Sequence, residues 1–514
     1  MKKIAVVLSV FITTIIVAQE NHTPKKFTQN SFGSLDYISV KMPNDEFNNP
    51  EENMGLAGVH YNLWLNNSIY TGVGFYGSVH GKRGGLFTLG VNAGFKTNII
   101  NNLFLDTGFH FGGGGGAGAP DGGGAFILPH LNLGLEFEKF STTLGYSSIN
   151  FFDKGNITSN QIRLGLQIPI SFDYTKFSNK EKSFSAKELK NSEWVTPSSK
   201  SAILLHLNNY IPKGNSQDTN GNIYPSGTTI RLAGIEYTKY LNDNWLLFFK
   251  ADGAFHGIDA GYMDIFLGGG YQFNFNQNRT RILTKFAIGA GGGGGVETQG
   301  GFLIHPDLAL EQKIFNSTYL SFNKGYIMTP NAFYKASTFG IGLKYNINSQ
   351  GLQKTQGTYF SNHKIKGIEI IIKNDVYFNA QRRVNPDENL HQIALQVNLF
   401  ATNNIYLAGQ TSFASFGNAG AYAEGIVGLG YQSNPIVRNK IQLFTQLLAG
   451  AAGGGHISTG QGLIIRPSVG LNLKLNDKLN FRTSIGKVKA RKGALNSTSL
   501  TLGLNYRIGF LTSK

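Results

Sequence analysis

The sequence predicts an all-β protein made of transmembrane, antiparallel, up-and-down β-barrels, and three observations lead to this fold class. The chain of 514 residues contains 66 glycines and no cysteine. Charged residues make up only 15% of it, below the roughly 25% of soluble domains. Apolar residues, 41% of the total, are spread by alternation and, after the first segment, never form a run long enough for a transmembrane helix. This combination is typical of barrels that cross a membrane with strands, and it excludes disulfide scaffolds and cysteine metal sites.

The first segment has the features of a secretory signal. Lys2 and Lys3 precede an apolar run from Ile4 to Val17, which ends at Ala18. The run is too short for a membrane-spanning helix, and no cysteine follows that could carry a lipid. We therefore expect residues 1–18 to be a signal peptide and the rest to be exported. The junction between Ala18 and Gln19 resembles signals common in Bacteroidetes, which implies a Gram-negative envelope.

The chain repeats one pattern three times. Each copy has a run of glycines, a short polar loop and then an apolar strand that contains a proline. The glycine runs lie at residues 112–116, 291–295 and 453–455, and the prolines are Pro129, Pro306 and Pro467. Another glycine recurs upstream as Gly94, Gly270 and Gly430. These six residues form the structural repeat motif of the chain.

The repeats define three units and two linkers. The units span residues 34–174, 201–346 and 366–510, and the polar linkers span 175–200 and 347–365. Each unit contains eight alternating segments of about 10–14 residues, which is long enough to cross a bilayer as strands. In the first unit they lie near residues 34–42, 54–65, 68–79, 85–100, 103–112, 126–138, 141–151 and 161–174. Short turns alternate with longer loops, as in outer-membrane barrels, and place both linkers on the periplasmic side.

Two architectures fit this number of strands: three separate eight-stranded barrels, or one barrel of about 24 strands. The inward positions of the fourth strand include Gly94, Gly270 and Gly430. An inward glycine makes room for a neighbour's side chain in a narrow, filled barrel, but has no such use in a wide channel. The long linkers also suit units that each close on themselves. We therefore expect three barrels, with polar interiors that are filled, and keep the single barrel as the alternative.

The unit layout resembles the superfamily of eight-stranded outer-membrane barrels, which includes small porin-like proteins and lipid A deacylases. The best match runs from residues 104–108 through the glycine-rich loop and Pro129 to the Gly145-Tyr146-Ser147 segment. The resemblance implies the fold, and deacylases carry a His-x-Ser pair on the seventh strand. No unit keeps that histidine; the corresponding segments of units two and three are Phe322-Asn323-Lys324 and Ile485-Gly486-Lys487. Without a general base, nucleophilic catalysis has no mechanism.

Other chemical interpretations are weaker. The glycine runs lack the Gly-Lys-Ser/Thr ending of a phosphate-binding loop and are better explained by unusual backbone angles at the strand ends, with a surface ligand site in these loops as the alternative. The prolines indicate a bulge or a rim position. The histidines near the glycine loops, His110, His130 and His305, are not repeated in unit three, so we expect no metal site and no cofactor.

Net charge is +16. Nucleic-acid binding is a poor interpretation for an exported barrel. Basic residues in or next to outward loops are candidates for contact with the phosphates of lipopolysaccharide, although a solvated loop surface is an equally good explanation. These candidates are Lys82, Arg83, Arg382, Arg383, Lys489, Arg491 and Lys492.

The sequence therefore predicts an integral outer-membrane protein without enzymatic activity. It would have a structural or binding role in the envelope through its outer loops, surrounded by outer-membrane lipid and lipopolysaccharide and inserted by the barrel-assembly machinery. The alternative is a pore or transporter formed by a single large barrel, and a lipid A-modifying hydrolase is a remote third possibility.

Overall fold

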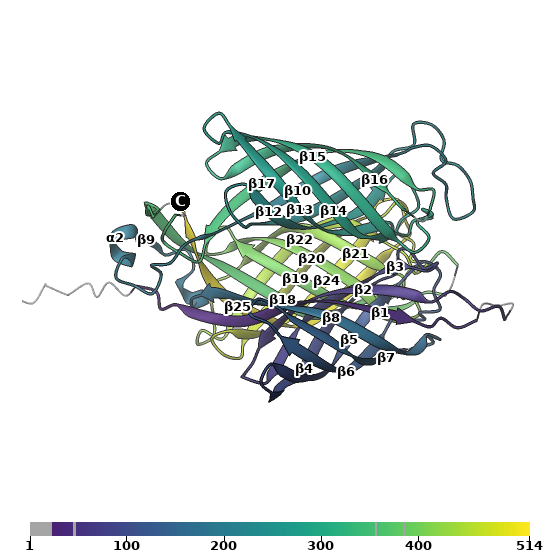
Figure 1. Cartoon of the computed structure of the whole chain (residues 1–514), viewed down its shortest axis with the longest axis horizontal. Helices are drawn as coiled ribbons and strands as arrows, with labels where there is room; N and C mark the ends of the chain where they lie inside the picture. Colours follow the sequence, from purple (N-terminus) through teal and green to yellow (C-terminus); the bar gives the residue numbers. More distant parts are fainter. Residues whose placement is uncertain (1–22, 45–47, 331, 355–356, 385) are drawn as a thin grey trace, which may run out of the picture.

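The computed structural model describes residues 23–44, 48–330, 332–354, 357–384 and 386–514. The proposed signal peptide at residues 1–18 lies outside this part of the chain. The described residues form almost entirely antiparallel β-structure, arranged as three closed eight-stranded barrels that lie side by side (Figure 1). The predicted fold class is thus confirmed.

Barrel 1 contains the first eight strands. They are β1 (Phe27–Val40), β2 (Met54–Trp64), β3 (Ile69–His80), β4 (Phe87–Ile100), β5 (Leu103–Gly115), β6 (Phe126–Glu136), β7 (Ser141–Phe151) and β8 (Thr158–Tyr174). All eight expected segments are present as strands. β1 begins earlier than expected because residues 27–30 pair with the end of β8, from Phe27 opposite Tyr174 to Asn30 opposite Ser171.

Barrel 2 contains β10 to β17. These are β10 (Ser199–Pro212), β11 (Ile230–Tyr240), β12 (Trp245–His256), β13 (Met263–Phe275), β14 (Thr280–Gly292), β15 (Phe302–Phe315), β16 (Thr318–Met328) and β17 (Lys335–Ser349). Barrel 3 contains β18 (Asn362–Ala380), β19 (Glu388–Phe400), β20 (Ile405–Phe416), β21 (Ala423–Gln432), β22 (Ile441–Gly453), β23 (Leu463–Lys474), β24 (Leu479–Ala490) and β25 (Asn496–Ser513). In each barrel the first strand pairs with the last: β1 with β8, β10 with β17 and β18 with β25.

Every barrel has a short-turn end and a long-loop end. At the short-turn end lie the linkers and the C-terminus, with the short elements η1 (Phe177–Asn179), β9 (Ser183–Ser185) and α2 (Ala186–Leu189) (Figure 1). The linkers are packed: Trp194 and Leu189 from the first contact Leu352 from the second, together with Ile365 and Leu511 of barrel 3. No helix in the described part of the chain is long and apolar enough to cross a membrane.

The three barrels pack in a ring near the long-loop end. The third strand of each barrel lies against the fifth strand of the next, so that β3 contacts β14, β12 contacts β22 and β20 contacts β5. Between them, Phe87 and Leu89 of barrel 1, Ala290 of barrel 2 and Phe413 of barrel 3 form one buried apolar cluster. A head-to-tail contact that closes after three units gives pseudo-threefold symmetry within one chain.

The barrels are also joined at the short-turn end. Thr175, directly after β8, exchanges two backbone hydrogen bonds with Gly509 of β25, at 2.7 and 2.9 Å. Asn348 and Ser349 at the end of β17 pair with Ser513 and Thr512 of β25. The last strand of barrel 3 therefore connects all three barrels at this end.

Candidate functional site

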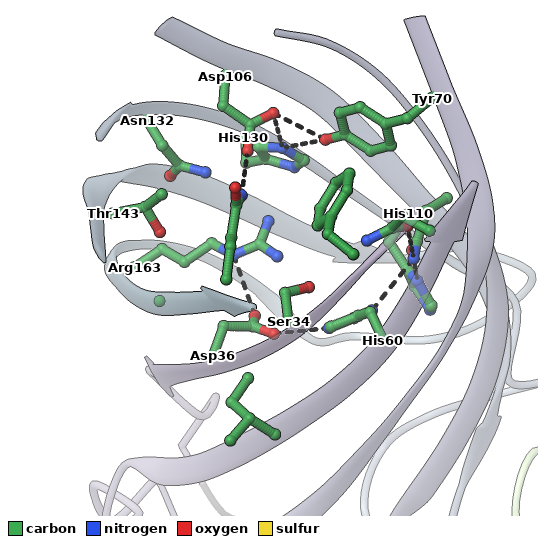
Figure 2. Close-up of a pocket in the computed structure, with 16 residues that line it drawn as sticks. Ser34, Asp36, His60, Tyr70, Asp106, His110, His130, Asn132, Thr143 and Arg163 are labelled. Atoms are coloured by element: carbon green, nitrogen blue, oxygen red, sulfur yellow. Dashed lines mark hydrogen bonds and ion pairs between the residues drawn. The ribbon is translucent and has the colours of Figure 1, made fainter. Parts of the chain in front are cut away.

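The interior of barrel 1 holds two hydrogen-bonded clusters, each around one carboxylate (Figure 2). Strand alternation points Asp36 of β1 inward, where it meets side chains from β2, β3 and β8. Its carboxylate lies 3.0 Å from Nε of Arg163 and 2.6 Å from Nε2 of His60, and it accepts a 2.7 Å hydrogen bond from Tyr76 Oη. Asn92 links His60 to His110: its Nδ2 lies 3.3 Å from Nδ1 of His60, and its Oδ1 lies 2.6 Å from Nδ1 of His110.

The second cluster surrounds Asp106 of β5, nearer the short-turn end. Its carboxylate accepts hydrogen bonds from Tyr70 Oη and Gln167 Nε2, both at 2.8 Å, and lies 3.7 Å from Nε2 of His130. A cavity of about 20 Å³ remains among these groups, which is room for about one water molecule. Barrel 1 is therefore filled across its width.

Barrel 2 is filled by ion pairs that follow one another along its length. Lys344 Nζ lies 2.8 Å from Glu311. Lys285 Nζ is 2.8 Å from Glu236 and 3.3 Å from Asp307. Nearer the long-loop end, Asp252 pairs with His206 at 2.5 Å and with Lys250 at 3.0 Å. These buried ions of opposite sign neutralise one another in direct contact, and their side chains occupy the interior of barrel 2.

Barrel 3 is centred on Arg466, a fully buried side chain on β23. Its guanidinium lies 2.7 Å from Asp375 and 3.5 Å from Glu424, and it donates a 3.1 Å hydrogen bond to Thr501. Lys373 Nζ is 3.5 Å from the same Asp375. All three interiors thus contain a buried ionic network, built from different residues in each.

Polar side chains fill the barrel interiors, as expected. His60, Asn62, Glu236, Thr238, Gln396 and Asn398 are all at most 4% exposed. The charged partners Asp36, Asp252, Lys285 and Asp375 had not been singled out. Their signal in the sequence is a charged residue at an inward position of an alternating segment, as in Leu35-Asp36-Tyr37.

The recurring fourth-strand glycines make room for a side chain of the third strand. Gly94 lies opposite Tyr70, and Gly430 opposite Tyr406. A Cβ at either glycine would overlap the facing tyrosine ring. At Gly270 the facing residue is Leu246, whose side chain approaches the same space less closely. Gly94 and Gly430 therefore make room for a side chain of the neighbouring strand, as expected.

The prolines need a correction, because they form no bulge. Pairing of β6 with β7 stops at Ile127–Asn150 and resumes at His130–Ser147 in the same register. The ladders next to Pro306 and Pro467 show the same gap. Proline lacks the N–H that a ladder needs, so it removes pairings without adding a residue to the strand.

The glycine loops form the junctions between barrels. Gly84 of barrel 1 donates a 2.6 Å hydrogen bond to Gln299 O of barrel 2, and Gly420 of barrel 3 donates one of 2.9 Å to Gly122 O of barrel 1. Barrels 2 and 3 meet through His256 Nδ1 and Gln461 Oε1 at 2.8 Å. The glycines thus allow positive backbone angles, as expected, and also let two backbones approach closely.

Several of the candidate basic residues are used within the protein. Arg83 forms two bonds with Glu51, at 2.7 and 2.5 Å, and donates to backbone carbonyls of the loop after β5. The buried Arg382 donates to the carbonyls of Gly417 and Asn418. The remaining candidates, Lys82, Arg383, Lys489, Arg491 and Lys492, are exposed at the long-loop end.

No reactive group faces a ligand at the position of the deacylase pair. Ser147 is 1% exposed inside barrel 1, and its hydroxyl accepts a 3.1 Å hydrogen bond from Gln161. Within the described residues, no cluster of three or more His, Asp or Glu side chains could hold a metal ion. His110 and His130 lie inside barrel 1 and His305 inside barrel 2, so these histidines do not converge.

The outer surface of the barrels is apolar. On β6, Leu131, Leu133 and Leu135 are each at least half exposed and alternate with the inward side chains of His130 and Asn132, and β15 and β25 show the same alternation. Exposed leucines in such rows are costly in water and stable in lipid. Polar residues inside and apolar residues outside are the pattern of transmembrane barrels.

Comparisons with known proteins give little. No protein-family model matches the chain, and no curated protein does. Among solved structures, Pseudomonas aeruginosa OccK11 (OpdR) is 11% identical with a TM-score of 0.22, and the match covers 95% of this chain and 98% of the OccK11 chain. Yersinia pestis Ail is 15% identical with a TM-score of 0.20, and the match covers 29% of this chain and 99% of the Ail chain. The siderophore receptor PirA of Acinetobacter baumannii is 8% identical with a TM-score of 0.27, and the match covers 94% of this chain and 81% of the PirA chain. Likenesses this low carry no argument about function.

Proposed function

We propose that the chain is an integral outer-membrane protein that serves as a structural or binding module of the envelope, without enzymatic activity. One observation carries this proposal: three closed barrels are apolar on the outside and filled with ion pairs on the inside. An apolar exterior supports a location in lipid, and a filled interior argues against the usual route for solute through a barrel. Any binding surface would then lie at the ends of the barrels, above all on the long loops.

The direction of insertion follows from loop lengths. Short turns and packed linkers are typical of the periplasmic side, and long loops of the outer side. The barrel-assembly machinery would insert each unit. The outer loops would present Lys82, Arg383, Lys489, Arg491 and Lys492, whose side chains are exposed, to the phosphates of lipopolysaccharide.

Planar-bilayer recording tests the closed-barrel proposal. The purified chain, reconstituted in a lipid bilayer, should show no stable conductance steps. Large, stable steps would overturn the proposal and favour the pore or transporter alternative. Insertion itself is checked separately by flotation with vesicles after an alkaline wash. This check ensures that a failure to insert is not mistaken for a closed barrel that does not conduct.

Two further assays test the proposed lack of enzymatic activity and the proposed contact with lipopolysaccharide. Incubation with lipopolysaccharide should leave all acyl chains attached, as read by mass spectrometry of lipid A; released acyl chains would establish a hydrolase instead. Replacing Lys489 and Lys492 with glutamine should lower the amount of lipopolysaccharide that stays with the protein during purification. Unchanged retention would leave these loops without the proposed contact.

A further inference from the structure

Two of the three barrels carry a pair of basic residues at the same place on the short-turn end. In barrel 2, Lys313 N donates a 2.7 Å hydrogen bond to Arg279 O in the adjacent turn. In barrel 3, Lys474 N donates a 2.8 Å hydrogen bond to Lys440 O in the corresponding turn. Lys313 and Lys474 each lie seven residues after the strand proline of their unit. The backbone therefore places the two pairs equivalently.

Barrel 1 differs at this place. The residue seven positions after Pro129 is Glu136, and its backbone N–H donates a 2.8 Å hydrogen bond to Asn102 O. The local geometry is thus the same in all three barrels, but the charge is not. The basic pairs are not needed to form the turn.

Exposed apolar side chains surround both basic pairs. Phe275 and Phe315, next to the pair of barrel 2, are 49% and 71% exposed. Val437 and Leu475, next to the pair of barrel 3, are 63% and 56% exposed. Since apolar side chains at the edge of a barrel lie in the outermost hydrocarbon, the cations directly beside them lie at the depth of lipid headgroups.

These cations are poorly compensated by the protein. Within the described residues, Arg279, Lys313 and Lys440 form no ion pair with a carboxylate, and Lys474 pairs with the exposed Asp477 at 2.8 Å. At the long-loop end, by contrast, Arg83 is held by Glu51 at 2.5 Å. The short-turn end therefore offers positive charge at headgroup depth that a negative partner can neutralise.

We propose that these two pairs bind the phosphates of anionic phospholipids, such as phosphatidylglycerol, in the leaflet at the short-turn end. The guanidinium of Arg279 and the ammonium groups of Lys313, Lys440 and Lys474 contact phosphate oxygens, while the neighbouring apolar side chains contact the acyl chains. Barrels 2 and 3 each hold such lipids and barrel 1 does not. This inference rests on the proposed membrane location.

The test uses the full chain in vesicles of phosphatidylcholine with and without phosphatidylglycerol, followed by native mass spectrometry of the lipids that remain bound. The wild-type chain should retain phosphatidylglycerol in preference to phosphatidylcholine. Replacing Arg279 and Lys440 together with glutamine should reduce this preference by about fivefold or more, since one basic residue near a membrane surface contributes about that factor. The control is Lys154→Gln with Lys213→Gln, which removes the same charge from the long-loop end.

The outcomes separate this inference from the proposed function. Equal retention of both lipids by a protein that has inserted overturns the inference and leaves the membrane location intact. An equal loss in the control variant also overturns it, because net charge alone would then explain the preference. If the chain inserts into neither type of vesicle, the proposed function itself fails. Preferential binding of a soluble acidic protein with no lipid preference would assign the surface to that partner instead.

Discussion

The ring of Tyr406 on β20 occupies the space inside barrel 3 that a side chain at Gly430 on β21 would fill. The two residues lie directly opposite each other in the ladder, and a Cβ on Gly430 would overlap the ring. Tyr406 in turn donates a 3.2 Å hydrogen bond to Gln446 and accepts one of 3.3 Å from Arg482. An inward tyrosine covering a glycine is a known device for keeping a curved strand pair packed.

Gly430→Ala should destabilise barrel 3 by about 1–3 kcal/mol, the usual cost of overpacking a well-packed interior. The tyrosine ring must move, and with it the hydrogen bonds to Gln446 and Arg482. Urea unfolding in detergent micelles measures the change. The matched control is Gly425→Ala on the same strand, where an added Cβ meets nothing within 4 Å. Equal losses in both variants would show that loss of glycine, and not the tyrosine, is responsible.

Gly84→Val should weaken the junction between barrels 1 and 2, because Gly84 lies against Gln299 and Thr298 of the neighbouring glycine loop. Each barrel should stay folded, since the substitution faces another barrel and not its own interior. The native sequence has no cysteine, so a thiol pair at His80 of barrel 1 and Gln299 of barrel 2, which line the same pocket between the two barrels, can report the junction through a short thiol crosslinker.

Crosslinking between positions 80 and 299 should be efficient in the otherwise native chain and clearly lower with Gly84→Val. The control substitution is Lys82→Val, at an exposed position of the same hairpin. A thiol pair at His80 and Gln353, at opposite ends of the molecule, should not crosslink. Unchanged crosslinking with Gly84→Val would contradict a role for this glycine in the junction.

The strands were predictable because period-two alternation is a local signal. β2 was expected at residues 54–65 and lies at Met54–Trp64. The inward glycines were also interpreted correctly, since their effect depends on a neighbouring strand of the same unit. The repeat itself set the number of strands for each barrel.

The junctions and the ion pairs were not predictable in the same way. Gly84 and Gln299 come from different units, and no pattern within one repeat indicates which barrel faces which. The partners of Arg466 on three other strands depend on the register and tilt of the closed barrel. The expected bulge at Pro129 was wrong because a bulge and a simple loss of pairing leave the same proline in the sequence.

Asp121 makes one of the three junctions sensitive to pH. It is 7% exposed in the loop after β5, and burial raises the pKa of its carboxyl to about 7, although a hydrogen bond from Gly116 N and the charge of Arg83 act in the opposite direction. The equivalent positions, Thr298 and Thr459, are neutral. In the unfolded chain the carboxyl ionises near pH 4, whereas in the folded chain it stays protonated to about pH 7.

Stability should therefore fall as pH rises from about 4 to about 7 and stay level above that, by an amount on the order of 4 kcal/mol. Asp121→Asn should match the wild-type chain at pH 4 and be more stable than it at pH 8, as measured by urea unfolding. Asp153→Asn is the control, because Asp153 lies at the same junction and accepts a 3.1 Å hydrogen bond from Gly417 N. A wild-type pH dependence that persists in Asp121→Asn would assign the effect to another group.

Arg466→Met should be among the most damaging substitutions in barrel 3. Removing this guanidinium leaves Asp375 and Glu424 buried with one fewer cation, and breaking a buried ion pair from one side costs about 3–5 kcal/mol. Asp375 retains Lys373 at 3.5 Å, which places the expected loss toward the lower end of that range. Urea unfolding should show it, whereas Arg231→Met, at an exposed position, should change stability by less than about 0.5 kcal/mol. Replacing Glu424 with glutamine in the Arg466→Met background should restore part of the loss, because Arg466 is the only cation that pairs with Glu424 within the described residues and the uncompensated charge is then removed as well. If the double variant were less stable than Arg466→Met alone, the interior would depend on Glu424 through its hydrogen bonds with Tyr377 and Tyr422 and not through its charge.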